Sequence, residues 1–269
     1  MNDKTNYWRE NGLNVQGAMS HHDEMEHRYY KEIYNCAEKT RCYSNNDMIE
    51  YLNKEKANEG EKPHVELSAS DTVTAAFHYG EGRTAILNFA SYKHPGGGYI
   101  DGKWAQEESL CNESILYEVL SRHQDFYDWN LEHLNRALYQ NRALYSPDVV
   151  FEHKGEKKLF DVITCAAPNA SAFLKYNQDN GEVEQTIEAR IMFLKFIVEA
   201  AEEPIDTLVL GAFGCGVFGC DPKMVAQMFK KHFETTTVKK IVYAVLGENT
   251  PNYKAFYKTL GATINVVRF

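Results

Sequence analysis

Two adjacent glutamates, Glu107 and Glu108, are of a type and spacing that suits acid–base chemistry. They follow Gln106, and seven residues (99–105) separate this Gln-Glu-Glu run from three consecutive glycines at positions 96–98. An apolar run typical of a buried strand precedes the glycines, and the glutamates fall in the first turn of a predicted helix. Like charges this close, together with burial, raise the pKa of one carboxyl group and can keep a general acid protonated near neutral pH.

Neither motif is specific by itself. Acidic residues favour the first turn of any helix because of the helix dipole, and glycines favour loops. Neighbouring helix positions point about 100° apart, so we expect that the two glutamates do not face one atom: one would contact a substrate, and the other would orient it or the loop. Both motifs together after a buried strand are more specific, although spacing alone leaves a purely structural origin open.

A second glycine-rich segment follows the apolar run 207–210. Its glycines are Gly211, Gly214, Gly216 and Gly219. Asp221 and Pro222 then suit the N-cap and the first position of a helix. Such a strand-to-helix turn exposes successive backbone N–H groups beside a helix N-terminus, which is an arrangement that suits a diphosphate and requires no lysine.

The same glycine segment also fits two different structures. Gly214, Gly216 and Gly219 match the G-x-G-x-x-G pattern of a nicotinamide dinucleotide site, for which Glu248 would be the acidic residue after the next strand. Only the 50 residues 220–269 follow the motif, too few for the remaining strands of a dinucleotide domain, and most of the strand–helix alternation precedes it. A tight turn with close helix packing is the structural alternative.

The charge of the chain limits its partners. Its 269 residues include 29 Lys and Arg against 38 Asp and Glu, a net charge of -9. Such a field repels polyanions at long range, so nucleic-acid binding through a broad cationic surface is not expected. The apolar content of 43% and charged content of 25% are ordinary for a globular protein and exclude a disordered or collagen-like chain.

The cysteines and histidines give weaker indications. None of the six cysteines forms a C-x-x-C pair, and we expect all six to be reduced and structural. His22 and His27 lie five positions apart, off the spacing of four that places two imidazoles on one metal, so no metal and no cofactor is expected. No window reaches the roughly 18 apolar residues of a membrane span, and the start MNDKTNYWREN lacks a signal-peptide profile. These features predict a soluble cytoplasmic protein.

From residue 65 onward, short β-branched runs alternate with amphipathic runs. The predicted strands are residues 72–78, 84–90, 149–153, 159–165, 207–211, 240–246 and 263–267. The predicted helices are residues 105–122, 125–139, 182–201, 222–233 and 251–260. A turn at 154–156 predicts a hairpin, and the alternation near the C-terminal end predicts a largely parallel, mixed sheet with helices on its faces.

The first 64 residues differ from the rest. Apolar side chains recur at helical spacing over residues 20–41, and the polar run 53–64 is typical of a linker or exposed loop. We therefore predict a helical N-terminal extension over 1–64 and one α/β domain over 65–269.

Two further side chains have open roles. Arg190 lies in the middle of the predicted helix 182–201 and could reach a phosphate, although a solvated helix face is the default expectation. Phe218 flanks the second glycine segment and could press on a ribose or base, and a role in the core is equally open.

The two glycine motifs, taken in this order, resemble the microbial-type poly(ADP-ribose) glycohydrolases, a branch of the macrodomain superfamily. The match comprises the glycines 96–98, seven residues, and then Gln106-Glu107-Glu108, with similar segments at 87–91, 146–150, 166–169 and 210–218. The resemblance covers about residues 85–247. It implies a three-layer αβα macrodomain-like fold and hydrolysis of the ribose–ribose O-glycosidic bond of poly(ADP-ribose), which releases ADP-ribose without a metal.

The same resemblance implies roles for particular residues. Glu108 would be catalytic, as general acid and then general base, and Glu107 would hold the substrate ribose. Residues 214–218 would cradle the diphosphate, with Phe218 orienting the distal ribose. The expected substrate-binding residues are Asn88, Gly97, Gly98, Gln106, Gly214, Cys215, Gly216, Val217 and Phe218. His94 departs from the family, which commonly has Asn there, and this puts fine specificity in doubt.

Other functions stay open at this point. They are a macrodomain that binds ADP-ribose without cleaving it, a hydrolase of mono-ADP-ribosyl groups or O-acetyl-ADP-ribose, and a nicotinamide-dependent oxidoreductase. The expected partners are ADP-ribose or poly(ADP-ribose) chains on modified proteins, and neither DNA nor a membrane. The sequence leaves open exo versus endo cleavage, the physiological target, the role of the N-terminal extension and the oligomeric state, for which a monomer is the expectation.

Overall fold

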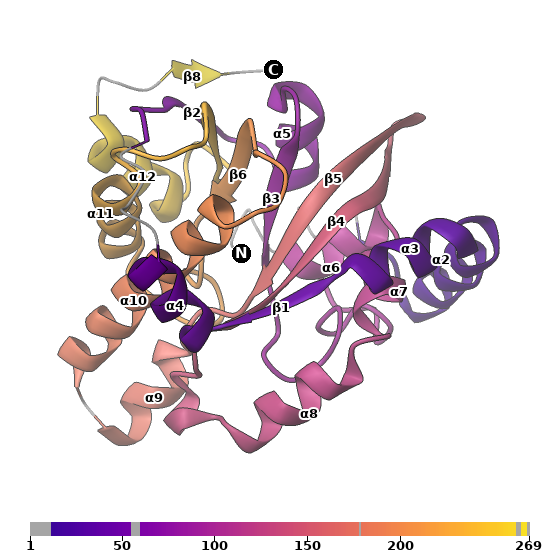
Figure 1. Ribbon diagram of the computed structural model, residues 1–269, viewed down its shortest axis with the longest axis horizontal. Helices are drawn as coiled ribbons and strands as arrows, with labels where there is room; N and C mark the ends of the chain where they lie inside the picture. Colours follow the sequence, from indigo (N-terminus) through magenta and orange to yellow (C-terminus); the bar gives the residue numbers. More distant parts are fainter. Residues whose placement is uncertain (1–11, 55–59, 178, 262–264, 268–269) are drawn as a thin grey trace.

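A mixed sheet of eight strands organises the computed structural model, which describes residues 12–54, 60–177, 179–261 and 265–267 (Figure 1). Its strands are β1 (Arg41–Ser44), β2 (His64–Ser68), β3 (Thr84–Phe89), β4 (Arg142–His153), β5 (Glu156–Cys165), β6 (Thr207–Gly211), β7 (Lys240–Ala244) and β8 (Asn265–Val267). The order across the sheet is β1-β4-β5-β3-β6-β7-β2-β8. The pairs β1–β4 and β4–β5 are antiparallel, and the other pairs are parallel.

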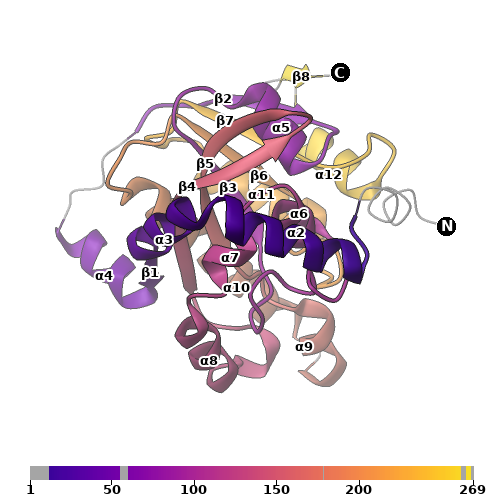
Figure 2. The ribbon, with the colours of Figure 1, turned by 90° about the vertical axis from the view of Figure 1, so that its right-hand side faces the viewer.

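Helices cover both faces of this sheet and give the three layers visible in Figures 1 and 2. One hydrophobic core includes α2 (Val15–Arg28), α3 (Tyr30–Lys39), α5 (Thr72–Tyr79), α6 (Gln106–Asn112), α7 (Leu116–Leu120) and α8 (Gln124–Glu132). The other includes α4 (Asn45–Lys54), α9 (Ala170–Asn177), α10 (Asn180–Glu199), α11 (Pro222–His232) and α12 (Pro251–Leu260). The prediction of a three-layer αβα fold with a mixed sheet is confirmed.

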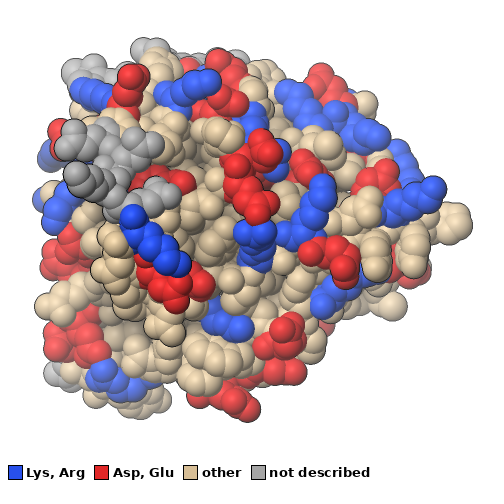
Figure 3. Space-filling model, in the orientation of Figure 1, with Lys and Arg blue, Asp and Glu red and all other residues tan. Residues whose placement is uncertain are grey.

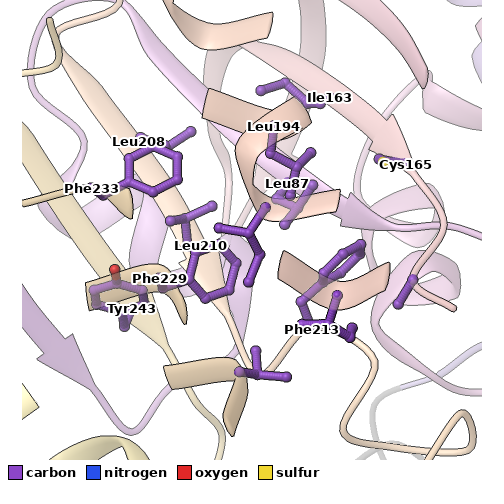
Figure 4. Close-up of a cluster of buried hydrophobic side chains, with 14 of the residues drawn as sticks. Leu87, Ile163, Cys165, Leu194, Leu208, Leu210, Phe213, Phe229, Phe233 and Tyr243 are labelled. Atoms are coloured by element: carbon purple, nitrogen blue, oxygen red, sulfur yellow. The ribbon is translucent and has the colours of Figure 1, made fainter. Parts of the chain in front are cut away.

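Successive side chains of the central strands point alternately into the two cores. In β6, Val209 belongs to one core, whereas Leu208 and Leu210 face α10 and α11 in the other (Figure 4), as successive side chains of a strand must. Phe213, two residues beyond β6, turns into the same cluster and is fully buried. Burying a side chain of this size contributes roughly 2–3 kcal/mol, so Phe213 anchors the start of the second glycine segment.

The predicted strand at 72–78 is wrong, because this segment forms helix α5. The Asp71 carboxylate accepts a hydrogen bond from the Thr74 amide at 2.9 Å and caps the helix. The segment is buried on most sides between the sheet and its neighbours. A short apolar run with burial all round has no amphipathic period, so periodicity could not separate a strand from a helix there.

Two predicted helices are shorter than expected. The run 105–122 is divided into α6 and α7, because Ser114 between them pairs with Phe151 of β4. The helix expected to reach Tyr139 ends at Glu132, and a turn follows in which several non-glycine residues have positive φ. The helix expected over 20–41 is likewise divided at Tyr29 into α2 and α3.

The remaining predicted elements are present with small shifts of their ends, except that the strand predicted over 149–153 is the second part of the longer strand β4, which begins at Arg142. The hairpin joins β4 to β5 through Lys154 and Gly155, which both have positive φ. The prediction for 263–267 falls partly outside the described residues, of which 265–267 form β8. The sequence did not predict β1, β2, α4 or α9.

The N-terminal region contributes to the same framework. Strand β1 pairs with β4 at one edge of the sheet, and α2 and α3 share a core with α5 and α7. Part of the expected linker, residues 55–59, lies outside the described residues, whereas Glu61 pairs with Thr236 and β2 begins at His64. The division at residue 64 stays a prediction.

Candidate active site

A cavity of about 810 Å3 lies where strands β3, β6 and β7 end. It is lined by Ser70, Asp71, Thr72, Phe89, Ala90, Ser91, Gly97, Trp104, Ala105, Gln106, Glu107, Glu108, Ala167, Ala212, Gly214, Cys215, Gly216, Val217, Phe218, Ala244, Val245, Leu246, Thr250, Pro251 and Asn252. Both predicted motifs contribute to this lining, although more than 100 residues separate them in the chain. The structure therefore brings the two motifs together at the carboxyl ends of parallel strands, where open α/β sheets bind ligands.

Gln106 fastens the first turn of α6 to the end of β3. Its amide oxygen accepts a hydrogen bond from the Phe89 amide at 2.8 Å, and its Nε2 donates to the Leu87 carbonyl at 2.9 Å and to Thr72 Oγ1 at 3.2 Å. Both polar atoms of the Gln106 side chain thus bind the backbone of β3. Gln106 sets the direction in which the next two side chains enter the cavity.

Glu107 is 3% exposed and is held by two donors. The Ser91 amide donates to Oε2 at 2.6 Å, and Asn88 Nδ2 donates to Oε1 at 3.1 Å. Burial raises the pKa of Glu107 from 4.5 to about 8, the nearby Glu108 adds to the rise, and the hydrogen bonds from Ser91 and Asn88 oppose it. One carboxyl group of the pair therefore carries a proton at neutral pH, as the spacing predicted.

This shift predicts a pH dependence of stability. A folded-state pKa above the unfolded value gives a contribution that is complete below about pH 4.5 and is lost as the pH rises through about 8. We expect Glu107→Gln, which cannot titrate, to gain stability relative to wild type over this range. Urea unfolding at several pH values measures the difference, with Glu132→Gln on an exposed side chain as control; a pH-independent difference would contradict the shift.

Glu108 is 7% exposed and differs from Glu107 in its contacts. The Gly98 amide donates to its Oε1 at 2.8 Å. Within the described chain, no group donates a hydrogen bond to its Oε2, and the residue lines the cavity. Glu108 therefore combines a fixed orientation with an oxygen that is available to a ligand.

The two carboxyl groups converge on Gly97. A Cβ at this position would lie 2.6 Å from Glu108 Oε1 and 2.9 Å from Glu107 Oε2, and the backbone φ is +62°. The expectation that the glutamates could not face one atom is wrong for this reason: the backbone directions diverge, but the side chains are long enough to meet. Only glycine fits both the left-handed conformation and the space.

The second glycine segment forms another part of the lining. Within the described residues, the amides of Gly214, Gly216, Val217 and Phe218 donate to no protein acceptor. Asp221 caps α11 by accepting from the Lys223 amide at 2.8 Å, as predicted. Of the described residues that line the cavity, none is a lysine or an arginine. Free amides beside a helix N-terminus can bind an anion without a basic side chain.

Space around the second segment is uneven. A Cβ at Gly214, which has φ +72°, would lie 2.7 Å from Ala167 Cβ, whereas one at Gly216 would meet nothing within 4 Å. Val217 is 87% exposed and Phe218 is partly buried. The loop is thus closely packed at Gly214 and open at residues 216–218, which line the cavity.

Two predicted site residues lie behind the cavity lining. Asn88 is fully buried and donates to Glu107 Oε1 and to Thr164 Oγ1 at 3.3 Å. Gly98 donates to Glu108 and is also absent from the lining. Both orient the carboxylates in this structure, and a direct contact with substrate stays a prediction. His94 is exposed and does not line the cavity either.

Sequence reasoning missed a third group of lining residues. They come from the β2–α5 connection (Ser70, Asp71, Thr72), from the end of β7 (Ala244, Val245, Leu246) and from the start of α12 (Thr250, Pro251, Asn252), and Trp104 lies before α6. The carboxyl ends of neighbouring parallel strands lie at one edge of a sheet, so the end of the predicted strand 240–246 could have indicated these lining residues.

The nicotinamide alternative is not supported, because the strand order differs from that of a dinucleotide domain and Glu248 does not line the cavity.

Other predicted features can be located as well. All six cysteines are free thiols. In the described part of the chain, no group of three His, Cys, Asp or Glu side chains could hold a metal ion, and no helix is long and apolar enough to cross a membrane. The absence of a metal requirement stays a prediction.

Comparisons with known proteins agree with this geometry. The family model of the microbial-type PARG catalytic domain matches residues 13–153. The crystal structure of poly(ADP-ribose) glycohydrolase from Thermomonospora curvata is similar, with a TM-score of 0.80 and 26% identity over 91% of this chain and 98% of the other. A search of curated proteins finds no match.

A second solved structure is more similar in sequence. It is poly(ADP-ribose) glycohydrolase from Deinococcus radiodurans in complex with ADP-ribose, with a TM-score of 0.77 and 30% identity over 85% of this chain and 96% of the other. The family match spans the Gln-Glu-Glu motif, and the structural matches extend over most of the chain. The chain belongs to the microbial-type poly(ADP-ribose) glycohydrolase family, whose members are glycosidases.

Proposed function

We propose that this protein hydrolyses the ribose–ribose O-glycosidic bond of poly(ADP-ribose) and releases ADP-ribose. The observation that supports it most is that one cavity holds both a pair of buried carboxyl groups and a loop of free amides. A related enzyme of this fold binds ADP-ribose. The free amides suit the diphosphate of the substrate, and the carboxyl groups suit acid catalysis at its ribose.

In the proposed complex, residues 216–218 bind the diphosphate through their backbone amides. This accounts for phosphate binding by a chain with a net charge of -9, because local dipoles act where the overall field is unfavourable. Phe218 lies against the distal ribose, and Glu107 accepts a hydrogen bond from a ribose hydroxyl. The anomeric carbon is then next to Glu108.

Glu108 performs the proton transfers in this proposal. In the proposed step, the one proton that the Glu107–Glu108 pair carries is on Glu108, which donates it to the oxygen of the departing ribose while the C–O bond breaks and an oxocarbenium-like centre forms. The resulting carboxylate then takes a proton from water, whose oxygen bonds to the anomeric carbon. One carboxyl group can serve both steps, because donating the proton makes it a base. Glu107 stays in place through its contacts with Ser91 and Asn88.

The proposal is tested by product release. We expect the purified protein to liberate ADP-ribose from an automodified poly(ADP-ribosyl) polymerase, measured by chromatography over time. Mono-ADP-ribosylated protein and O-acetyl-ADP-ribose, offered separately, test the two other hydrolase activities. Tight binding of the polymer without release would replace the proposal with a binding module, and a faster reaction with either alternative substrate would replace it with that activity.

Location and assembly are further proposals. We infer a cytoplasmic location from six free cysteines, since reduced thiols are typical of that compartment. We expect a monomer that binds ADP-ribose polymers and no DNA. On the face drawn in Figure 3, acidic and basic side chains are mixed. This mixture supports the expectation that DNA does not bind to that face.

A further inference from the structure

A small aromatic cluster lies apart from the two main cores. It consists of Tyr92, Tyr139 and Ala166 with Leu134, Ala137 and Phe218 packed against them. The rings of Tyr92 and Tyr139 are stacked with centroids 4.2 Å apart, and Tyr139 meets Phe218 edge-on at 6.1 Å. Of these six residues, Phe218 is the member that lines the cavity. The cluster therefore supports one wall of the site from behind.

Tyr139 belongs to a turn with an unfavourable backbone. Asn135, Arg136, Ala137 and Tyr139 have φ values of 42°, 52°, 71° and 61°. Residues with a Cβ avoid this region because the Cβ crowds a carbonyl oxygen. Such a turn persists only when its surroundings hold it, and strain of this kind gathers at functional sites.

Arg190 holds this turn from the opposite side. Its guanidinium is fully buried and donates to the carbonyls of Leu138, at 3.5 Å, and Ala166, and to Asn141 Oδ1 at 2.7 Å. Among the described residues, no carboxylate lies within ion-pair distance of it. The expected solvated position for Arg190 is thus wrong. A buried cation is costly unless its donors are satisfied, so its contacts favour one arrangement of the turn.

The cluster also reaches the segment that holds the glutamates. Tyr92 directly follows Ser91, whose amide donates to Glu107. The Tyr92 carbonyl accepts from Asn130 Nδ2 at 2.9 Å, and its hydroxyl accepts from the Gln140 amide at 3.3 Å. The stacked rings therefore span the distance between the segment behind Glu107 and the loop that carries Phe218.

We propose that Tyr139, kept in place by the turn that Arg190 holds, is a positioning residue that sets Phe218 against the ribose beside the bond to be cleaved. The inference rests on the proposed function, in which Phe218 contacts that ribose. Tyr139 itself does not line the cavity and acts through Phe218. A well-placed contact of this kind contributes mainly by fixing the substrate geometry.

The first test separates positioning from folding. We expect Tyr139→Leu to lower kcat about tenfold with KM within about threefold, and Tyr139→Phe, which keeps the ring, to stay within about twofold of wild type. Phe233→Leu is the matched control, since Phe233 is equally buried at the far end of α11 and packs on Phe229. Equal activity losses at matched melting temperatures for the Tyr139→Leu and Phe233→Leu proteins would overturn the proposal.

The decisive measurement is a double-mutant cycle with Phe218→Ala. In that background Tyr139→Leu should have little further effect on kcat, because its action passes through Phe218. A second comparison uses the affinities for ADP-ribose and for ADP, which lacks the distal ribose: Tyr139→Leu should weaken ADP-ribose binding by no more than about threefold, in line with KM, and should leave ADP binding unchanged. An active wild type with additive effects would overturn this inference alone, whereas a wild type that neither cleaves nor binds ADP-ribose would overturn the proposed function with it.

Discussion

Replacing Glu108 by Gln is expected to lower ADP-ribose release about 10³-fold while ADP-ribose still binds, because general acid–base catalysis contributes rate enhancements of about this size. The amide keeps the shape of the side chain, and its oxygen can still accept the hydrogen bond from the Gly98 amide. It cannot donate a proton to the departing ribose or take one from water. In the proposed complex, binding depends mainly on the amides of residues 216–218, which the substitution leaves unchanged.

The measurements are the release of ADP-ribose from polymer and the calorimetric affinity for free ADP-ribose. Glu113→Gln is the matched control, because this carboxyl group lies just beyond the end of the same helix and pairs with His153 outside the cavity. The control should retain turnover. Turnover near the wild-type rate in the Glu108→Gln protein would remove Glu108 from its proposed role.

Replacing Gly97 by Ala is expected to lower kcat about 100-fold, since displacing a catalytic group by as little as 1 Å can have an effect of this size. The added methyl group would lie 2.6 Å from Glu108 Oε1 and 2.9 Å from Glu107 Oε2. Neither oxygen can remain where it is, because both distances are too short for a methyl group. Moving the oxygens disturbs the hydrogen bonds that each accepts from a backbone amide. We therefore expect both carboxyl groups to move together.

Gly155→Ala provides the control for backbone strain. Gly155 in the β4–β5 turn has φ +84°, close to the +62° of Gly97, but an added Cβ meets nothing within 4 Å. The left-handed conformation should lower the stability of both variants by roughly 1 kcal/mol, and crowding of the two oxygens should lower that of Gly97→Ala further, as measured by urea unfolding. Only Gly97→Ala should also lose activity. Full activity in the Gly97→Ala protein would show that the carboxyl groups do not need this spacing.

Elements with a clear period were predictable from the sequence. The helix predicted over 182–201 is α10, with Val183, Ile187, Ile191 and Leu194 buried, because a long amphipathic helix has one face that must leave water. The strand 207–211 was predicted with its observed bounds. The hairpin at 154–156 was also correct, since Lys154 and Gly155 adopt the positive φ that a tight turn needs.

Elements whose structure depends on their neighbours were not predictable in the same way. Helix α5 is surrounded by other elements and has no polar face to reveal its period. The break between α6 and α7 arises from the pairing of Ser114 with Phe151, which are distant in the chain. Arg190 occupies a helix position that resembles an exposed face, yet three polar oxygens from other segments surround its guanidinium.

The sequence by itself determined the chemistry that this protein can offer: two carboxyl groups at the start of a helix, glycines where backbone amides must be bare, and a strand-to-helix turn suited to a diphosphate. The tertiary structure decided which carboxyl group holds the raised pKa, that both meet at Gly97, and that the two glycine segments line one cavity. The physical reason is that residue types and local periods are encoded over a few positions. Burial and distance, in contrast, depend on which parts of the chain pack together across the whole sheet.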